Sequence, residues 1–201
     1  MDLIVGGGKF GLKAAEYLLL RKRDFIIIDP SDECAAARKF KEKFVKAEAK
    51  DLEKFVKKFE PEWIFPTAPI HVAAEALKDK FIPWNEKVNE ILSGIPARVI
   101  VSVGTGSIVV SYNRDKICLD NCSSPEICPV TKIKRPCPMY ELLRFACPEA
   151  KILISHQLSP GIGAINGKDF ASLLEEARKV EKIVVVTACN CHGVLTALMS
   201  S

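Results

Sequence analysis

Cysteines are the residues of this chain that are best suited to chemistry, and they are unevenly distributed. Cys34 is the only cysteine before residue 118, whereas five fall within residues 118–147 at Cys118, Cys122, Cys128, Cys137 and Cys147. Prolines between and beside them exclude a continuous helix or central strand, so this segment is predicted to be a long loop, and such loops in compact domains are usually functional or disordered. Thiolates on a proline-stiffened loop can converge on a metal, and Cys-Pro pairs are typical of iron–sulfur sites.

A second group of donor side chains lies near the end of the chain. Cys189, Cys191 and His192 follow an apolar strand predicted at 183–186 and precede what reads as a short helix. Two thiols and an imidazole at a strand end could complete a centre begun by the loop. We therefore expect the metal ligands to come from Cys118, Cys122, Cys128 and Cys137, and next from Cys189 and Cys191.

The chemistry of these cysteines stays open at this point. Their spacing matches no ferredoxin pattern and lacks the paired C-x2-C of a zinc ribbon. An iron–sulfur cluster is favoured, and zinc, redox-active thiols and buried structural cysteines are the alternatives. Disulfides are disfavoured because we expect the chain in the reducing cytoplasm.

The other chemical motif lies at the start of the chain. The apolar run 2–5 is followed by Gly6, Gly8 and Gly11 in G-x-G-x-x-G order, then by helical spacing of apolar residues, and then by the strand 25–28 ending in Asp29. The glycines permit a tight turn, close approach of a pyrophosphate and close helix packing. The helix N-terminus offers free N–H groups to phosphates.

These features predict a dinucleotide or adenine-nucleotide site. A carboxylate at Asp29 can accept hydrogen bonds from a ribose and would repel a 2′-phosphate, so NAD is favoured over NADP. The alternative is a glycine turn that binds nothing. The residues expected at the cofactor are Gly6, Gly7, Gly8, Lys9, Phe10, Gly11, Asp29, Glu48 and Thr67.

Two histidines are candidates for proton transfer. His71 and His156 each follow a predicted strand end, where a doubly wound fold places its ligand crevice. An imidazole titrates near neutral pH and could exchange a proton alongside hydride transfer. A structural role, with His71 capping a helix, is the competing interpretation.

Elements alternate regularly through the first part of the chain. Strands are predicted at 2–5, 25–28, 44–47 and 62–65. The helices between them follow the glycine turn, cover about 32–43 and begin at Asp51, and a further helix is predicted over 72–80. This order predicts a Rossmann-like parallel sheet flanked by helices, with right-handed crossovers. We place this nucleotide-binding domain at 1–96, ending in a proline-containing connection over 81–96.

The remainder, 97–201, is predicted to be a second α/β portion that carries the Cys-rich loop. Two β-rich runs, 98–103 and 107–112, flank a glycine turn and indicate a hairpin. A strand at 151–155, a glycine-rich loop at 156–167, a helix at 170–180 and a strand at 183–186 suggest a βαβ-like unit. That loop could contact a phosphate or carboxylate, but it lacks the P-loop order.

The first 80 residues resemble two known families. The stretch from Ile4 to Gly11, the run Ile26 to Asp29 and an acid after the third strand resemble the nucleotide-binding regulatory domains of Trk-type potassium uptake. The Val-Gly-Gly-Gly-Lys stretch also resembles the precorrin dehydrogenases of siroheme synthesis. Both resemblances imply NAD or an adenine nucleotide at the glycines and Asp29, and neither extends to 97–201.

Composition limits the remaining possibilities. The formal charge of +4 is modest and no basic block stands out, so nucleic-acid binding is not expected. Without a signal peptide or a long apolar run, the chain is expected to be cytoplasmic, with no membrane partner. We expect a small-molecule nucleotide as its ligand, with a homodimer left open. An NAD-binding oxidoreductase is the favoured function; a nucleotide-sensing regulator and a tetrapyrrole dehydrogenase are the alternatives.

Overall fold

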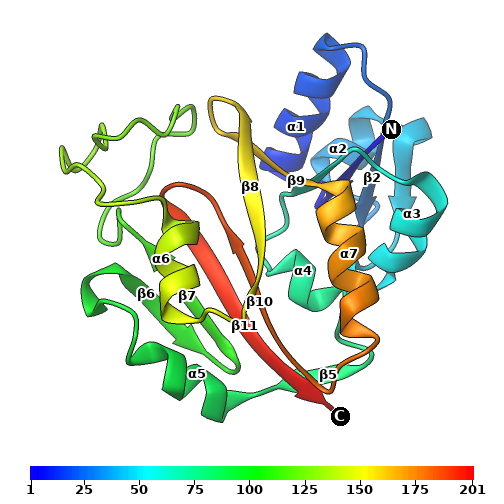
Figure 1. The fold of residues 1–201 in the computed structure, drawn as a ribbon. Helices are drawn as coiled ribbons and strands as arrows, with labels where there is room; N and C mark the ends of the chain where they lie inside the picture. Colours follow the sequence, from blue (N-terminus) through cyan, green and yellow to red (C-terminus); the bar gives the residue numbers. More distant parts are fainter. The chain divides into compact units, whose positions relative to one another are not determined.

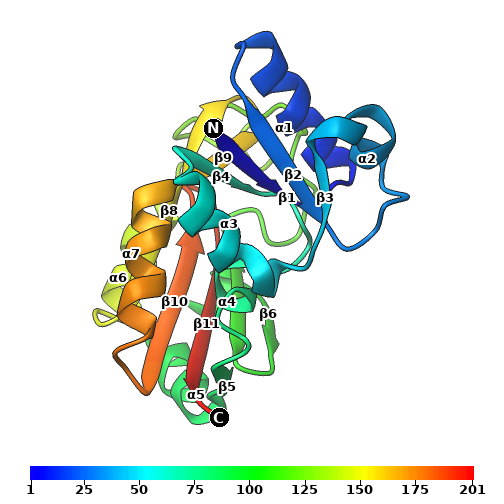
Figure 2. The same cartoon turned by 90° about the vertical axis from the view of Figure 1, so that its right-hand side faces the viewer.

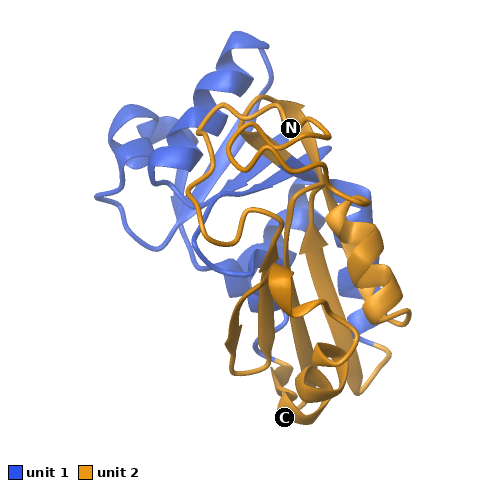
Figure 3. Ribbon diagram, turned by 90° about the vertical axis from the view of Figure 1, so that its left-hand side faces the viewer, with its two compact units in different colours: residues 1–79, 164–178 blue, residues 80–163, 179–201 orange.

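The computed structural model describes all residues, 1–201, and the chain divides into two compact units. Unit 1 contains residues 1–79 and 164–178, and unit 2 contains 80–163 and 179–201 (Figure 3). The first boundary between the two units therefore lies near residue 79, whereas the sequence predicted a domain boundary at residue 96. Local sequence could not show that a segment from late in the chain completes the first unit. No helix is both long and apolar enough to cross a membrane.

Unit 1 is built on a short parallel sheet. Its strand order is β3-β2-β1-β4, with β9 added antiparallel to β4, as seen in Figure 2. The strands are β1 (Asp2–Val5), β2 (Phe25–Asp29), β3 (Phe44–Lys46), β4 (Trp63–Pro66) and β9 (Ile162–Asn166). Parallel neighbours on both sides explain why β1 is an unbroken buried run. The predicted Rossmann-like fold class is confirmed.

Helices cover both faces of this sheet. α1 contacts α2, and α3 contacts α7, as expected when the chain crosses over β1 to place its fourth strand. The helical segments are α1 (Lys9–Leu20), α2 (Ala35–Lys39), η1 (Lys41–Lys43), η2 (Ala49–Asp51), α3 (Leu52–Phe59), α4 (Val72–Glu75) and α7 (Gly167–Ala177).

Unit 2 contains a mainly antiparallel sheet. Its order is β8-β10-β11-β7-β6; β8 and β10 are parallel, the other neighbours are antiparallel, and β5 pairs with β11. The strands are β5 (Phe81–Pro83), β6 (Ile100–Gly104), β7 (Ser107–Ser111), β8 (Lys151–Ser159), β10 (Lys182–Ala188) and β11 (His192–Ser200). The predicted β6–β7 hairpin is confirmed.

Two helices pack on this second sheet (Figure 1). α5 (Asn85–Leu92) contacts β7 and β11, and α6 (Met139–Ala146) contacts β8, β10 and β11; η3 (Ala97–Val99) leads into β6. Val88 and Ile91 from α5 and Met139 and Leu143 from α6 belong to one buried cluster with side chains of β7, β10 and β11. The amphipathic spacing of these short helices places their apolar residues on this cluster.

Several predicted element boundaries were wrong. The helix expected over 32–43 is reduced to α2 and η1, and that over 72–80 to α4. The glycine-rich loop expected at 156–167 forms the end of β8, a turn at Gly161 with φ of +69°, and β9. The short helix expected after Cys191 is strand β11, and α6 ends the Cys-rich loop. Pairing with distant strands decided these segments, and local patterns do not report it.

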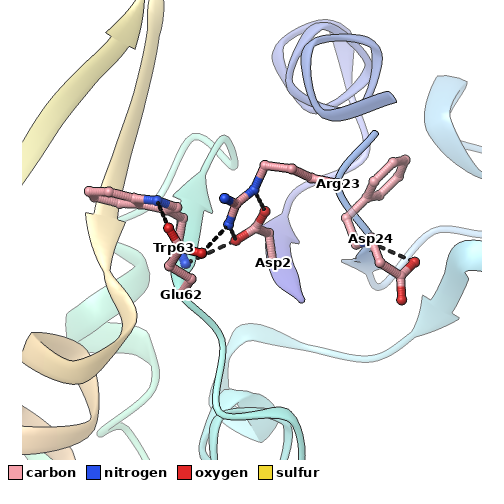
Figure 4. Close-up of polar contacts among 6 residues, drawn as sticks. Asp2, Arg23, Asp24, Glu62 and Trp63 are labelled. Carbon is pink, nitrogen blue, oxygen red and sulfur yellow. Dashed lines mark hydrogen bonds and ion pairs between the residues drawn. The ribbon is translucent and has the colours of Figure 1, made fainter. Parts of the chain in front are cut away.

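A buried carboxylate fixes the start of the parallel sheet. Asp2 is fully buried and receives two hydrogen bonds from Arg23, from Nε at 2.6 Å and Nη2 at 2.8 Å (Figure 4). The backbone N–H of Trp63 also donates to Asp2, at 3.1 Å, and Arg23 reaches Glu62 at 2.7 Å. One guanidinium thereby ties β1, β2 and β4 together, and these bonds raise the pKa of Arg23 further above its usual range.

We expect Arg23→Met to destabilise the protein by about 3 kcal/mol, because a fully buried carboxylate loses its bidentate partner. Chemical denaturation measures the change. Lys39→Met is the matched control: its ion pair with Glu16 is exposed on both sides, so a change within about 0.5 kcal/mol is expected. Equal effects of the two substitutions would contradict this role of Asp2.

Candidate functional site

The glycine turn of unit 1 has the geometry that its sequence predicts. Gly6 adopts φ of +109°, which favours glycine, and a Cβ at Gly11 would collide with the carbonyl oxygen of Gly6. Gly8 is different, because a Cβ added there would meet nothing within 4 Å. Gly8 is exposed and stands just before α1, so the space beside it is available to a ligand at the helix N-terminus.

Asp29 is tied to this turn from the end of β2. Its carboxylate accepts hydrogen bonds from the backbone N–H of Gly7 at 2.6 Å and of Ser31 at 2.8 Å. Each carboxylate oxygen keeps a further lone pair, so ribose hydroxyls can still be bound. Cys34 packs against Gly7 closely enough that any side chain at residue 7 would strike its sulfur.

The other predicted cofactor contacts have local roles. The Thr67 hydroxyl donates to the carbonyl of Gly6 at 2.7 Å, which holds the end of β4 against the turn. Glu48 forms a reciprocal capping box with Asp51 and an ion pair with Lys50. Lys9 and Phe10 are exposed in the first turn of α1.

The two histidines do not form a shared site. His71 is the N-cap residue of α4 without a side-chain capping bond, and loss of water around its ring lowers its pKa to about 3. It is therefore neutral at pH 7, contrary to the expectation that it titrates there. His156 lies inside strand β8, not after a strand end, and its side chain is exposed.

The side chains best suited to chemistry gather around a cavity in unit 2. Its volume is about 750 Å³, within the roughly 300–1,000 Å³ typical of small-molecule sites. Five cysteines and a histidine line it: Cys118, Cys122, Cys128, Cys189, Cys191 and His192. All of these cysteines are free thiols. The structure thus brings the predicted loop and the predicted 189–192 group together.

Backbone hydrogen bonds explain this convergence. The N–H of Tyr112, at the end of β7, donates to the carbonyl of Cys191 at 3.0 Å. The N–H of Met139, at the start of α6, donates to the carbonyl of Asn190, also at 3.0 Å. The loop 113–138 therefore begins and ends on the same turn, which is formed by residues 189–192.

Three cysteine sulfurs of the cavity accept hydrogen bonds from the backbone N–H groups of residues that follow them by two or three positions in the sequence. Ser124 donates to Cys122 at 3.3 Å, and Thr131 donates to Cys128 at 3.5 Å. Both Cys191 and His192 donate to Cys189 at 3.4 Å. Such N–H···S bonds stabilise thiolates and are a recurrent feature around iron–sulfur clusters. Burial alone would raise the pKa of Cys128, but hydrogen bonds from Thr131 and Val130 lower it.

Cys118 has a different environment. Its sulfur lies 3.2 Å from Nε2 of His192 and accepts a hydrogen bond from the Asn113 amide at 3.0 Å. Burial raises the pKa of Cys118, despite the Asn113 bond, and the charges of Cys128, Cys122 and Cys191 raise it further. Partial desolvation lowers the pKa of His192. This pair therefore favours a neutral thiol and imidazole over an activated thiolate–imidazolium pair.

Cys191 is held by polar groups of the loop. Its sulfur lies 3.2 Å from the Ser124 hydroxyl and 3.3 Å from Nη1 of Arg135. Cys137, also predicted as a ligand, does not line the cavity; its sulfur is 3.5 Å from the Tyr112 hydroxyl. Cys147 is buried in the core cluster.

The structure does not contain a preformed metal site. No three His, Cys, Asp or Glu side chains are arranged to hold a metal ion. The donors are nonetheless suitable in type and number, since four thiolates can hold an iron–sulfur cluster. Metal ligation would require these thiols to move into a ligating arrangement.

Sequence reasoning missed two residues of this cavity. Asn113 and Arg135 each contact a cavity sulfur, yet neither belongs to a recognisable motif. Their only sequence signal is position, two residues after the end of β7 for Asn113 and within the proline-rich loop for Arg135.

The chain matches two domain models of one protein family. Residues 1–72 match the family model AF_1314_N, and residues 70–201 match AF_1314_C, described as the N-terminal and C-terminal domains of an uncharacterized protein. The chain belongs to this family. An uncharacterized protein of Archaeoglobus fulgidus is 56% identical over 212 residues, covering 98% of this chain and 99% of that protein. The N-terminal match contains the glycine turn of this chain, and the C-terminal match contains the residues of its cysteine cavity.

A solved structure shows a weaker likeness. The UDP-glucose 4-epimerase of Thermotoga maritima, crystallised with UDP-glucose, is 18% identical with a TM-score of 0.30. The match covers 47% of this chain and 30% of the epimerase, and is too low to carry an argument. The resemblances to Trk-type domains and precorrin dehydrogenases stay predictions.

The environment of His71 predicts an acid-sensitive fold. Its pKa is about 3 when folded and about 6.5 when unfolded. The unfolded state therefore binds the proton first, and stability falls as the pH drops from about 6.5 towards 3, by up to about 1.4 kcal/mol per pH unit. His71→Gln should reduce this slope in urea denaturation series. Parallel pH profiles for the two proteins would contradict the assignment.

Proposed function

We propose that this chain is an NAD-binding, oxidoreductase-like protein whose cysteine cavity holds a thiolate-ligated iron–sulfur cluster. The observation that supports this proposal is the cavity itself, which is lined by five free cysteines from two segments distant in sequence. The N–H···S bonds to three of them support thiolates there. When bound, such a cluster supplies one-electron transfer.

Contacts within the cavity suggest the ligand set. Ser124 contacts the sulfurs of both Cys122 and Cys191, the sulfur of Cys118 lies 3.2 Å from His192 beside Cys191, and the charge of Cys128 acts on Cys118. We therefore favour Cys118, Cys122, Cys128 and Cys191 as the four ligands, which replaces Cys137 of the sequence-based set. Arg135 beside Cys191 would offset part of the negative charge of four thiolates.

Nucleotide binding is proposed at the glycine turn of unit 1. Gly8 leaves open space before α1, and Asp29 is fixed beside the turn with lone pairs to spare. These features suit a pyrophosphate at the helix N-terminus and a ribose at the carboxylate. NAD is favoured, since a 2′-phosphate would be repelled by Asp29.

The cluster is tested on anaerobically purified protein. We expect stoichiometric iron and acid-labile sulfide with broad visible absorption, and their loss in Cys122→Ser and Cys191→Ser because each removes a proposed ligand. Cys137→Ser is the matched control and should retain the iron. Protein free of iron and sulfide, or equal losses in Cys137→Ser, would overturn this part.

The nucleotide site is tested with Gly8→Ala. The structure has room for the added methyl group, so stability should change by no more than about 1 kcal/mol. The methyl group would occupy the approach of the pyrophosphate, and we expect NAD affinity to fall at least about tenfold, a loss of about 1.4 kcal/mol. Calorimetry measures both effects. A folded variant that binds NAD as tightly as the original chain would refute the site.

A turnover assay distinguishes the proposed oxidoreductase from a nucleotide-sensing regulator. An oxidoreductase should oxidise NADH in the presence of an artificial electron acceptor, whereas a nucleotide sensor would bind NADH without consuming it. Binding without turnover would therefore move the assignment to the regulator predicted from the Trk-type resemblance.

A further inference from the structure

Asn113 is a buried amide that is satisfied at one end and unsatisfied at the other. It is only 6% exposed, and its Nδ2 donates a hydrogen bond to the sulfur of Cys118 at 3.0 Å. Its Oδ1 is buried without a hydrogen-bond partner. A buried acceptor that lacks a donor lowers stability, so the stability of unit 2 does not explain an amide at this position. What the side chain contributes is the hydrogen bond to the sulfur.

The backbone that carries this amide is held firmly at the cavity. The N–H of Asn113 donates to Oγ of Ser111, at the end of β7, at 2.9 Å. The preceding N–H, that of Tyr112, donates to the carbonyl of Cys191 at 3.0 Å. The donor to Cys118 therefore stands on the same anchor that fixes the 189–192 turn, and such support keeps the geometry of a hydrogen bond to a ligand constant.

Asn113 differs from the other side chains that lie close to the proposed ligand sulfurs. Nδ2 of an amide is always a donor, whereas Nε2 of His192, 3.2 Å from the sulfur of Cys118, donates only when that nitrogen carries the proton. Arg135, 3.3 Å from the sulfur of Cys191, carries a charge and also holds two carbonyls of the loop. The hydrogen bond from Asn113 can thus be removed without changing the charge of the cavity.

We infer that Asn113 raises the reduction potential of the cluster proposed for this cavity, through its hydrogen bond to the ligand sulfur of Cys118. The inference rests on the proposed function. Reduction by one electron adds negative charge that the ligand sulfurs share, so an N–H donor stabilises the reduced cluster more than the oxidised cluster. Asn113 acts through Cys118 and does not itself ligate the cluster.

The potential is measured on the full chain, purified anaerobically, by titration with dithionite as the electron donor and detection by electron paramagnetic resonance. Asn113→Leu nearly keeps the size of the side chain and removes the donor. We expect reduction to become about tenfold less favourable, which lowers the one-electron midpoint potential by about 59 mV. Asn190→Leu is the matched control, because Asn190 lines the same cavity without a side-chain hydrogen bond to a sulfur, and it should keep the original potential.

Unfolding of the iron-free protein provides a second readout. Because Oδ1 of Asn113 is buried without a partner, Asn113→Leu should not lower the denaturant concentration at which the iron-free chain unfolds. Asn113→Ala removes the same donor without added bulk and takes the place of Asn113→Leu if the larger side chain prevents folding. A variant that loses stability but keeps the original potential would show that Asn113 is structural and would overturn the inference.

An unchanged or raised potential in a folded, cluster-containing Asn113 variant would also overturn it, as would equal falls in Asn113→Leu and Asn190→Leu. Loss of the fold or of the cluster in both Asn113 variants has the same consequence, since a donor that tunes the potential is not required for folding or assembly. Iron and sulfide in the original chain separate the two proposals. Their absence refutes the proposed function and the inference that rests on it, whereas a cluster whose potential does not respond to Asn113 refutes this inference alone.

Discussion

Two backbone hydrogen bonds to the 189–192 turn hold the candidate site together. The carbonyls of Asn190 and Cys191 receive the N–H groups of Met139 and Tyr112, so the long loop leaves and rejoins the sheet at one turn. Close packing supports this arrangement, because a side chain at Gly193 would strike Leu143 of α6. The cost of ordering a long loop is reduced when its ends are fixed beside each other. Without this anchor, five thiols would not share one cavity.

The site combines rigid and adaptable parts. The 189–192 turn follows Ala188 and the loop ends at Met139, both of which belong to the buried core of unit 2, whereas the central loop has only one isolated β-bridge, between Ile127 and Lys134. The sulfurs of Cys122, Cys128 and Cys189 accept N–H groups of their own turns, whereas the sulfur of Cys191 is held by Ser124 and Arg135 of the loop. The cluster proposed for this cavity would need both parts, since its ligands must be close but able to adjust to the coordination geometry.

Unit 1 has its own constraint, which is independent of the cysteines. Arg23 satisfies the buried carboxylate of Asp2 at one end of β1, and the glycine turn follows at the other end. β1 is thereby fixed between β2 and β4, and the turn is held where both Asp29 and Thr67 can reach it. The chemistry of a nucleotide site requires such a stiff support, because backbone N–H groups cannot adjust independently to a phosphate.

The sequence by itself determined the β-α-β start, the glycine turn with Asp29, the hairpin and the two groups of cysteines, since these depend on local spacing and on glycine's access to positive φ. Only the tertiary structure decided that residues 164–178 belong to unit 1, that 156–167 forms strands and that Cys137 lies outside the cavity. It alone revealed Asn113 and Arg135, because a side chain beside a sulfur distant in sequence leaves no periodic signal. Strand pairing and cavity lining are long-range properties that local patterns cannot encode.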